Sequence, residues 1–274
     1  MEQDLRVAAA MMQAVVGDTP GNLARAGRLV EEAAGQGAGL VLLPEACLTG
    51  YTVRRPVEPL AEPVPGPLTE EIVALAKWHR LYVLAGLVET GPYLTHVLAG
   101  PEGFLGAYRK THLSPLEKTR FRAGDRLGLF AAGRVRIGLA LCYEAHFPEI
   151  GTALALAGAD ILCLPHASPH DGSEEMRIRW GKYLPARAYD NGLFVAACNQ
   201  AGPNGDGLIF GGAAVILDPR GEVLAQAASD RDGLIVADLK AADQARVRQS
   251  PMGFFLPRRR PELYRFPTAT TPEQ

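Results

Sequence analysis

The sequence predicts a layered α/β fold with mixed β-sheets, and three observations support this prediction. Short apolar runs alternate along the chain with longer amphipathic stretches, which is the order expected when helices are layered on sheets. Two turn sequences, Gly91-Pro92 and residues 101–103, separate three consecutive strand-like runs and indicate hairpins, so the sheets are not purely parallel. No change of composition and no low-complexity linker divides the 274 residues, so we expect a single domain over residues 1–274.

The individual elements follow from local patterns. Residues 5–14 read as a strand, and Thr19-Pro20 can open a helix through residue 34, because proline is favoured in a first helical turn. Residues 39–44 are almost continuously apolar, which indicates a buried strand. By the same criteria we expect strands over residues 82–88, 93–99, 104–108, 135–141, 160–164, 193–199, 213–217 and 234–236, and helices over residues 68–79, from Pro148, and over residues 174–189 with an irregularity at Pro185.

The composition is that of an ordinary globular protein. With 28 basic and 30 acidic side chains the formal net charge is −2, which leaves no electrostatic footprint for nucleic acid. The first residues are acidic where a secretory signal needs positive charge, and no apolar run is long enough to cross a membrane. Four cysteines are too few for a disulfide framework in a chain of this length. We therefore expect a cytoplasmic protein with neither a membrane nor a nucleic-acid partner.

Cys142 is the most informative single residue. It ends an apolar strand-like run, and Pro148 then announces a helix, so its thiol is expected at a strand-to-helix junction where backbone N–H groups can bind an anion. A cysteine nucleophile needs a base or a positive neighbour at neutral pH. From position alone, a small buried side chain is the simpler interpretation. That simpler interpretation is the one we adopt for Cys47, Cys163 and Cys198.

Two charged residues follow other strands and could supply such neighbours. Glu45 comes directly after the buried run 39–44, where desolvation would raise its pKa and suit it to proton transfer. Lys110 ends the run that begins at Phe104, and an ammonium there could stabilise an oxyanion. Taken singly, a loop glutamate and a surface lysine are the simpler interpretations.

Taken together, three segments resemble the nitrilase, or carbon–nitrogen hydrolase, superfamily. They are residues 43–45 with Gly50-Tyr51, residues 108–113, and residues 142–144 with residues 147–149. The resemblance extends from Gln13 through Arg187-Ala188, Asn199-Gln200 and Asp218-Pro219 to residues 259–264, which is nearly the whole chain.

This resemblance, to the amidase-like branch, implies an αββα sandwich that carries a Glu–Lys–Cys triad. Glu45 would be the general base, Cys142 the nucleophile, and Lys110, beside the Tyr143 backbone N–H, the oxyanion stabiliser. Glu117 matches a second glutamate of many members and would orient Lys110 or the substrate, although a salt-bridging surface glutamate is the alternative. No metal and no organic cofactor is implied.

The sequence also departs from the commonest amidase pattern. Glu144 replaces an aspartate two positions after the cysteine, His146 replaces an arginine, and the strand around His96 lacks an asparagine. These departures leave the substrate open. We expect supporting or substrate-binding roles for Tyr143, Glu144, His146 and His166.

Residues 165–170 contain two histidines, His166 and His170. A titrating histidine there could bind a substrate carboxylate or carbonyl, and bonding to the backbone is the alternative. Cys163, His166 and His170 also mimic the spacing of metal ligands. Because prolines interrupt this segment and no fourth ligand is evident, we expect no metal site.

The leading functional hypothesis is hydrolysis of a small amide through a cysteine thioester, which releases ammonia or an amine. A nitrilase is the nearest competing hypothesis, but nitrilases commonly have tryptophan after the cysteine and this chain has Tyr143. Two hypotheses from different classes are a non-catalytic binding protein on the same fold and a metal-dependent hydrolase. By analogy we expect a homodimer or larger homo-oligomer, with residues 250–274 as a C-terminal tail at the subunit interface.

Overall fold

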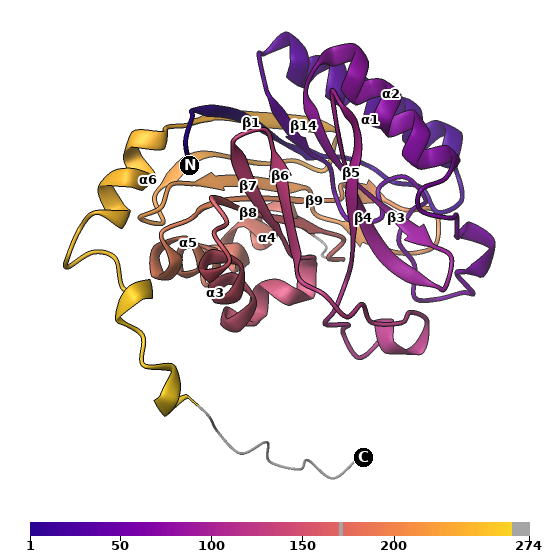
Figure 1. Cartoon of the computed structure of the whole chain (residues 1–274). Coiled ribbons are helices and arrows are strands. Elements are labelled where there is room, and N and C mark those ends of the chain that lie inside the picture. Colours follow the sequence, from indigo (N-terminus) through magenta and orange to yellow (C-terminus); the bar gives the residue numbers. More distant parts are fainter. Residues whose placement is uncertain (170–171, 265–274) are drawn as a thin grey trace.

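The computed structural model describes residues 1–169 and 172–264 and shows two β-sheets packed face to face with helices on their outer surfaces (Figure 1). This is the αββα sandwich with mixed sheets that the sequence predicted. The first sheet has the strand order β14-β1-β2-β3-β4-β5 and the second has the order β13-β12-β9-β8-β7-β6. The strands of the first sheet are β1 (Leu5–Met11), β2 (Leu40–Leu42), β3 (Tyr82–Glu89), β4 (Tyr93–Gly100), β5 (Gly103–Arg109) and β14 (Gly233–Leu239).

The second sheet and the helices complete the four layers. The strands of the second sheet are β6 (Gly128–Ala132), β7 (Val135–Leu139), β8 (Ile161–His166), β9 (Phe194–Asn199), β12 (Ala213–Leu217) and β13 (Val223–Ala228). The helices are α1 (Thr19–Gly35) and α2 (Pro67–His79) on the first sheet, α3 (Pro148–Leu156), α4 (Ser173–Trp180) and α5 (Leu184–Asn191) on the second, and α6 (Ala241–Arg248) after β14. Strands β10 (Gly202–Pro203) and β11 (Ile209–Phe210) form a separate small hairpin.

The alternating direction of side chains along a strand explains how one strand contributes to two hydrophobic cores. In β1, Val7 and Ala9 face the core between the two sheets, whereas Ala8 and Ala10 face helices α1 and α2. Successive side chains of a strand point to opposite faces, so a strand that is covered on both sides must be apolar throughout. All four of these side chains are fully buried.

The strands that carry the candidate site residues all end at the same end of the sandwich. Strand β2 is parallel to β1 and β3, and the β3–β4–β5 hairpins bring the end of β5 back to the end of β2. In the second sheet β7, β8 and β9 are parallel. A parallel bridge between Met12 and Gln200 aligns the ends of the two sheets. The segments after β2, β5, β7 and β8 therefore converge.

The structure differs from the predicted elements in two respects. The helix expected over residues 174–189 is divided into α4 and α5, because Pro185, which lacks an N–H, fits only the first turn of a new helix. Strands β6, β10, β11 and β13 and helix α6 were not predicted. The side chains of β13 are all exposed or half-buried, so it lacks the apolar pattern that reveals a covered strand.

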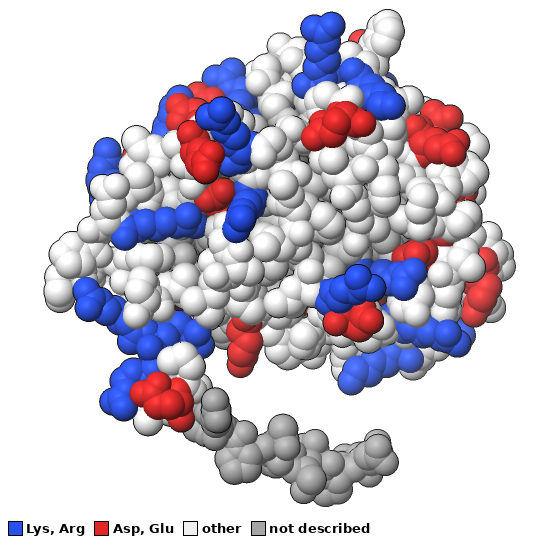
Figure 2. All heavy atoms as spheres, in the orientation of Figure 1, with Lys and Arg blue, Asp and Glu red and all other residues white. Residues whose placement is uncertain are grey.

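The surface and the tail complete the description. Figure 2 shows basic and acidic side chains interspersed over the face in view. Within residues 1–169 and 172–264, no helix is both long and apolar enough to cross a membrane. After α6 the chain makes short turns at Leu256–Arg258 and Pro261–Leu263 and leaves the body of the molecule (Figure 1). The remainder of the predicted tail, residues 265–274, lies outside the described residues.

Candidate active site

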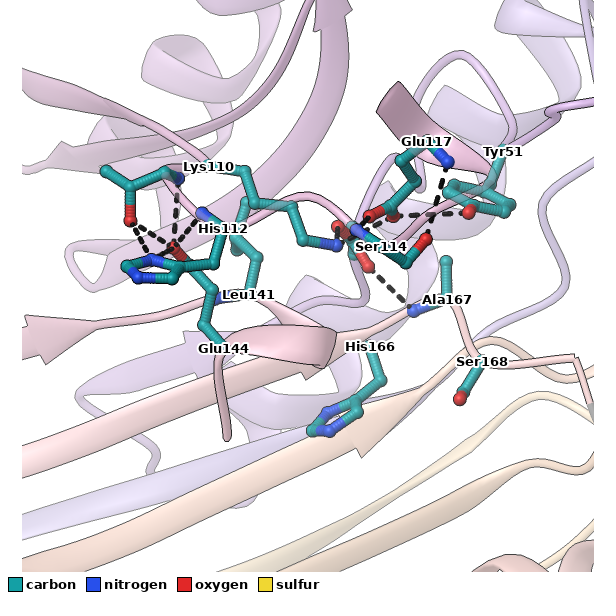
Figure 3. Close-up of polar contacts among 12 residues, drawn as sticks. Tyr51, Lys110, His112, Ser114, Glu117, Leu141, Glu144, His166, Ala167 and Ser168 are labelled. Carbon is teal, nitrogen blue, oxygen red and sulfur yellow. Dashed lines mark hydrogen bonds and ion pairs between the residues drawn. The ribbon is translucent and has the colours of Figure 1, made fainter. Parts of the chain in front are cut away.

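A fully buried ammonium group lies between two buried carboxylates at the convergent strand ends (Figure 3). Lys110 Nζ donates hydrogen bonds to Glu45 Oε1 at 2.9 Å and to Glu117 Oε1 at 2.7 Å. Burial disfavours the charged form of Lys110, but the two carboxylates outweigh this effect, so the pKa of Lys110 is raised. Lys110 therefore keeps its positive charge in the interior.

Glu45 is held by groups from three other segments. Besides Lys110, its Oε2 accepts a hydrogen bond from the Ala167 N–H at 3.1 Å, and its backbone oxygen accepts one from Gln200 Nε2 at 2.7 Å. Burial raises the pKa of the Glu45 carboxyl to about 7, against the lowering effect of Lys110. A carboxylate with a pKa near neutrality is suited to taking up and returning a proton.

Cys142 differs from the other cysteines in its exposure. It is partly accessible and lines a cavity of about 200 Å³, whereas Cys47, Cys163 and Cys198 are buried. Burial and the Glu45 charge raise the pKa of the Cys142 thiol to about 12, although Lys110 lowers it. The resting thiol is therefore protonated, and a nearby base is needed to make it a nucleophile.

The backbone conformation at two turns helps to position the Glu45 carboxyl group and the Cys142 thiol. Within residues 1–169 and 172–264, the non-glycine residues with positive φ are Ala46 at 51°, Arg80 at 56° and Cys142 at 45°. This conformation costs an L-residue roughly 1–2 kcal/mol, and two of these strained positions are Cys142 itself and the residue after Glu45. A Cβ at Gly86 would lie 2.3 Å from the Ala46 nitrogen, which explains the glycine opposite this turn.

Glu117 is buried within the cluster, so the surface-glutamate alternative is wrong. Its Oε1 accepts hydrogen bonds from Lys110 and from the Tyr51 hydroxyl, the latter at 3.1 Å, and its Oε2 accepts one from the Ser114 N–H at 2.7 Å. These contacts fix the carboxylate where it can orient Lys110. Glu117 also lines the cavity beside Cys142.

Glu144 connects the cysteine turn to the lysine segment. Its Oε2 accepts a hydrogen bond from the Leu141 N–H at 2.6 Å. Its Oε1 accepts hydrogen bonds from four donors, which are the Tyr108 hydroxyl, the Thr111 N–H and hydroxyl, and the His112 N–H. The side chain is buried and is absent from the described lining of the cavity. Glu144 is thus arranged for support rather than for substrate contact.

The other expected residues surround the cavity. Tyr143, His146 and His166 all line it. His146 is exposed. Its ring packs on Tyr183 with centroids 4.6 Å apart, and partial desolvation together with the positive charges of Arg179 and Arg187 lowers its pKa. Sequence reasoning missed Tyr51, Ala167 and Tyr183 as parts of the site. Tyr51 was visible in the Gly50-Tyr51 segment, whereas local sequence holds no signal for the Ala167 N–H.

The ligand spacing of Cys163 and His166 does not produce a metal site. Cys163 faces the core between the sheets, whereas His166, three residues later on the same strand, faces Trp180 on the helical side. Side chains three apart on a strand point to opposite faces, so these two cannot share an ion. His170 lies outside the described residues.

The protein has an αββα sandwich in which a carboxylate, an ammonium and a thiol group converge. These features place it in the class of cysteine-dependent α/β hydrolases. Within that class the chain belongs to the carbon–nitrogen hydrolase family, whose family model matches residues 6–249. The protein is therefore an enzyme of that family, as the resemblance predicted.

Relatives with assigned names include both amidases and nitrilases. Deaminated glutathione amidase of Homo sapiens is 36% identical over 271 residues, covering 90% of this chain and 80% of the relative. A nitrilase of Pyrococcus abyssi is 32% identical over 268 residues, covering 95% and 99%. Among solved structures, an amidase of the nitrilase superfamily from Nesterenkonia AN1 matches with a TM-score of 0.79 at 28% identity, covering 97% of both chains.

Proposed function

We propose that the protein hydrolyses small amides through a thioester on Cys142. The observation that carries this proposal is the buried Glu45–Lys110–Glu117 cluster beside a cysteine at the wall of a cavity of about 200 Å³. Ligand pockets for drug-sized molecules are typically larger, roughly 300–1,000 Å³. The cavity therefore suits a small substrate.

The first half of the reaction follows from the chemistry of these groups. The Glu45 carboxylate takes the proton of the Cys142 thiol while sulfur attacks the carbonyl carbon of the amide. The Lys110 ammonium stabilises the negative charge that develops on the carbonyl oxygen. When the C–N bond breaks, Glu45 returns its proton to the nitrogen, and ammonia or an amine leaves. The acyl group remains on sulfur as a thioester.

In the second half a water molecule attacks the thioester. Glu45 takes a proton from this water, and the tetrahedral intermediate collapses by breaking the C–S bond. The proton returns to Cys142 sulfur, and the carboxylic acid is released. Lys110 and Glu117 keep their positions throughout, since their mutual hydrogen bond involves no transferred proton.

The Nesterenkonia amidase supports this assignment. In glutamate variants of that enzyme, the acetamide moiety of fluoroacetamide adds covalently to the active-site cysteine. A cysteine-to-alanine variant of it binds butyramide. By analogy, Cys142 is the residue expected to form the covalent bond in this chain.

Mass spectrometry of the intact protein tests the proposal. We expect incubation with small amides, and with fluoroacetamide, to leave an acyl or alkyl adduct on Cys142, and the Cys142→Ala variant to lose both adduct and turnover. Cys163→Ala, which removes a thiol from the core between the sheets, is the control and should retain both. Unchanged turnover in Cys142→Ala would overturn the proposal.

Nitrile hydrolysis is the second candidate, favoured by the Pyrococcus abyssi relative named a nitrilase. Both reactions use the same thiol, so matched amide and nitrile pairs with identical acyl groups separate them. We expect kcat/KM to favour the amide.

The location and assembly of the protein are also part of the proposal. We propose a cytoplasmic homodimer or larger homo-oligomer in which the tail contacts a neighbouring subunit. The partly exposed Tyr189 and Phe255 rings pack with centroids 5.6 Å apart where the tail leaves the body, which would supply apolar surface for such a contact. A light-scattering mass equal to one chain would contradict it.

A further inference from the structure

His166 forms part of the cavity wall and is almost completely buried. It ends strand β8, and its ring packs on Trp180 with centroids 4.8 Å apart. The next residue, Ala167, donates its N–H to Glu45, so the His166 side chain leaves the backbone close to the ionic cluster (Figure 3). Cys142 and His166 line the same cavity, so a substrate held at Cys142 shares this cavity with His166.

The tautomer of His166 is fixed by its own strand. Nδ1 lies 2.8 Å from the Leu164 carbonyl oxygen, and because a carbonyl oxygen only accepts, Nδ1 must carry the proton. Burial, together with the nearby positive charges of Lys110 and Arg179, lowers the pKa of His166 to about 3. The ring is therefore neutral at physiological pH, and Nε2 presents a lone pair.

This lone pair is unused. Within the described part of the chain, Nε2 has no hydrogen-bond partner, although it is shielded from solvent. Buried polar atoms in proteins almost always have a partner, so an unpartnered atom on a residue that lines a cavity needs an explanation. A carboxylate or a carbonyl cannot provide one, because each also only accepts hydrogen bonds. The ligand group suggested by the sequence does not fit this tautomer, and a donor does.

The surroundings restrict what that donor can be. Lys110 and Arg179 both act on the ring as positive charges, so an ammonium donor would be repelled. The cavity of about 200 Å³ favours a short acyl chain. Among the uncharged donors that a short acyl chain can carry, a hydroxyl group is the smallest, and it satisfies both conditions.

We propose that His166 Nε2 accepts a hydrogen bond from a hydroxyl group on the acyl part of the substrate, so that the enzyme prefers short hydroxylated amides to plain alkyl amides. The inference rests on the proposed amidase function and specifies its substrate class. His166 is thus assigned as a specificity-determining residue, whereas the covalent chemistry stays with Cys142.

Two isosteric substrate pairs test this inference, because each pair exchanges a hydroxyl for a methyl group. The pairs are 2-hydroxypropanamide with 2-methylpropanamide and 3-hydroxypropanamide with butanamide. We expect the wild-type kcat/KM to favour the hydroxylated member of at least one pair by about tenfold or more, the value of one hydrogen bond to a buried group. Methoxyacetamide, which offers an ether acceptor but no acyl donor, should behave like the alkyl amides.

The variant His166→Phe keeps an aromatic ring against Trp180 but removes the acceptor. We expect it to bring both ratios close to one by lowering kcat/KM of the hydroxylated members more than that of the alkyl amides. Tyr183→Phe, which removes a hydroxyl from the same cavity, is the matched control and should keep the wild-type preference.

The outcomes are distinguishable. A wild-type ratio near one for both pairs overturns the inference without any variant, and so does a preference that survives in a folded His166→Phe protein. In both cases amide turnover continues, so the proposed function stands. If no amide of either pair is hydrolysed and no adduct forms on Cys142, the proposed function and the inference both fail.

Discussion

Two buried glutamates of the site have contrasting surroundings. Glu45 faces one ammonium and one backbone N–H, and its burial raises its pKa to about 7. Glu144 accepts five hydrogen bonds from Tyr108, Thr111, His112 and Leu141, and no lysine or arginine ion pair with it is observed in the described residues. The first carboxylate can exchange a proton, whereas the second has its acceptor capacity filled. The contrast teaches that burial alone does not make a carboxylate a base: its partners decide.

The largest loss of activity is expected when the Glu45 carboxylate, the proposed base, is replaced. Glu45→Gln keeps the size of the side chain and a hydrogen-bond acceptor for Lys110, but an amide cannot take the thiol proton. We expect kcat to fall by about 10²–10⁴-fold, the usual contribution of general base catalysis. Steady-state kinetics on an amide substrate measure the loss, and thermal unfolding shows whether the fold is kept. A decrease of less than tenfold in a folded variant would contradict the role of Glu45.

Removing the Lys110 ammonium group, which lies between the two carboxylates, should cause the next largest loss of activity. Lys110→Met leaves Glu45 and Glu117 buried without their shared cation, so one of them must bind a proton, and the oxyanion loses a charged donor. We expect kcat/KM to fall by about 10²–10³-fold. Lys118→Met removes an exposed lysine from the same segment and should have little effect. Equal losses in the two variants would show that the effect does not arise from the buried cluster.

The substitution of glutamine for glutamate at Glu144 should act mainly on the stability of the fold. In Glu144→Gln one oxygen becomes an NH₂ group, so either the Leu141 N–H or the four donors at Oε1 lose their acceptor. An unsatisfied buried donor costs roughly 1–3 kcal/mol, and the strained Cys142 turn would shift because Leu141 precedes it. We expect a lower free energy of unfolding together with a reduced kcat.

Glu149→Gln, at an exposed glutamate near the start of α3, is the control for this prediction. Denaturant titration of both variants gives the free energies of unfolding. If Glu144→Gln is as stable as Glu149→Gln, the five hydrogen bonds do not contribute as described.

The sequence was sufficient to predict which strands position the candidate site residues. Apolar runs located the strands that precede Glu45, Lys110 and Cys142, and the three family-like segments indicated that these strands converge. The sandwich itself followed from that resemblance. Edge strand β13 was missed because its half-exposed side chains give no clear alternation.

The partners of each side chain could not be predicted. The donors to Glu144 Oε1 are 32 to 36 residues away in the sequence, so their convergence depends on tertiary packing. The hydrogen bond that Glu117 accepts from the Tyr51 hydroxyl likewise joins residues 66 positions apart. The tautomer of His166 depends on how its ring folds back onto the Leu164 carbonyl, and residue type does not determine that.

The smallest expected effect is a pH dependence of activity that tests Glu45 as the base. Glu45 acts as a base only when deprotonated, and its pKa is raised to about 7, so activity should be present above this pH and fall as the pH decreases through it. Below pH 7, kcat/KM should fall by about tenfold per pH unit, the slope of a single protonation. The Cys142 thiol, with a pKa near 12, and His166, with a pKa near 3, cannot produce a transition there. His146→Asn should keep the transition, whereas Glu45→Asp should move it, because a shorter carboxylate changes its distance to Lys110. If the transition moves in Glu144→Asp and not in Glu45→Asp, the roles of the two carboxylates must be exchanged.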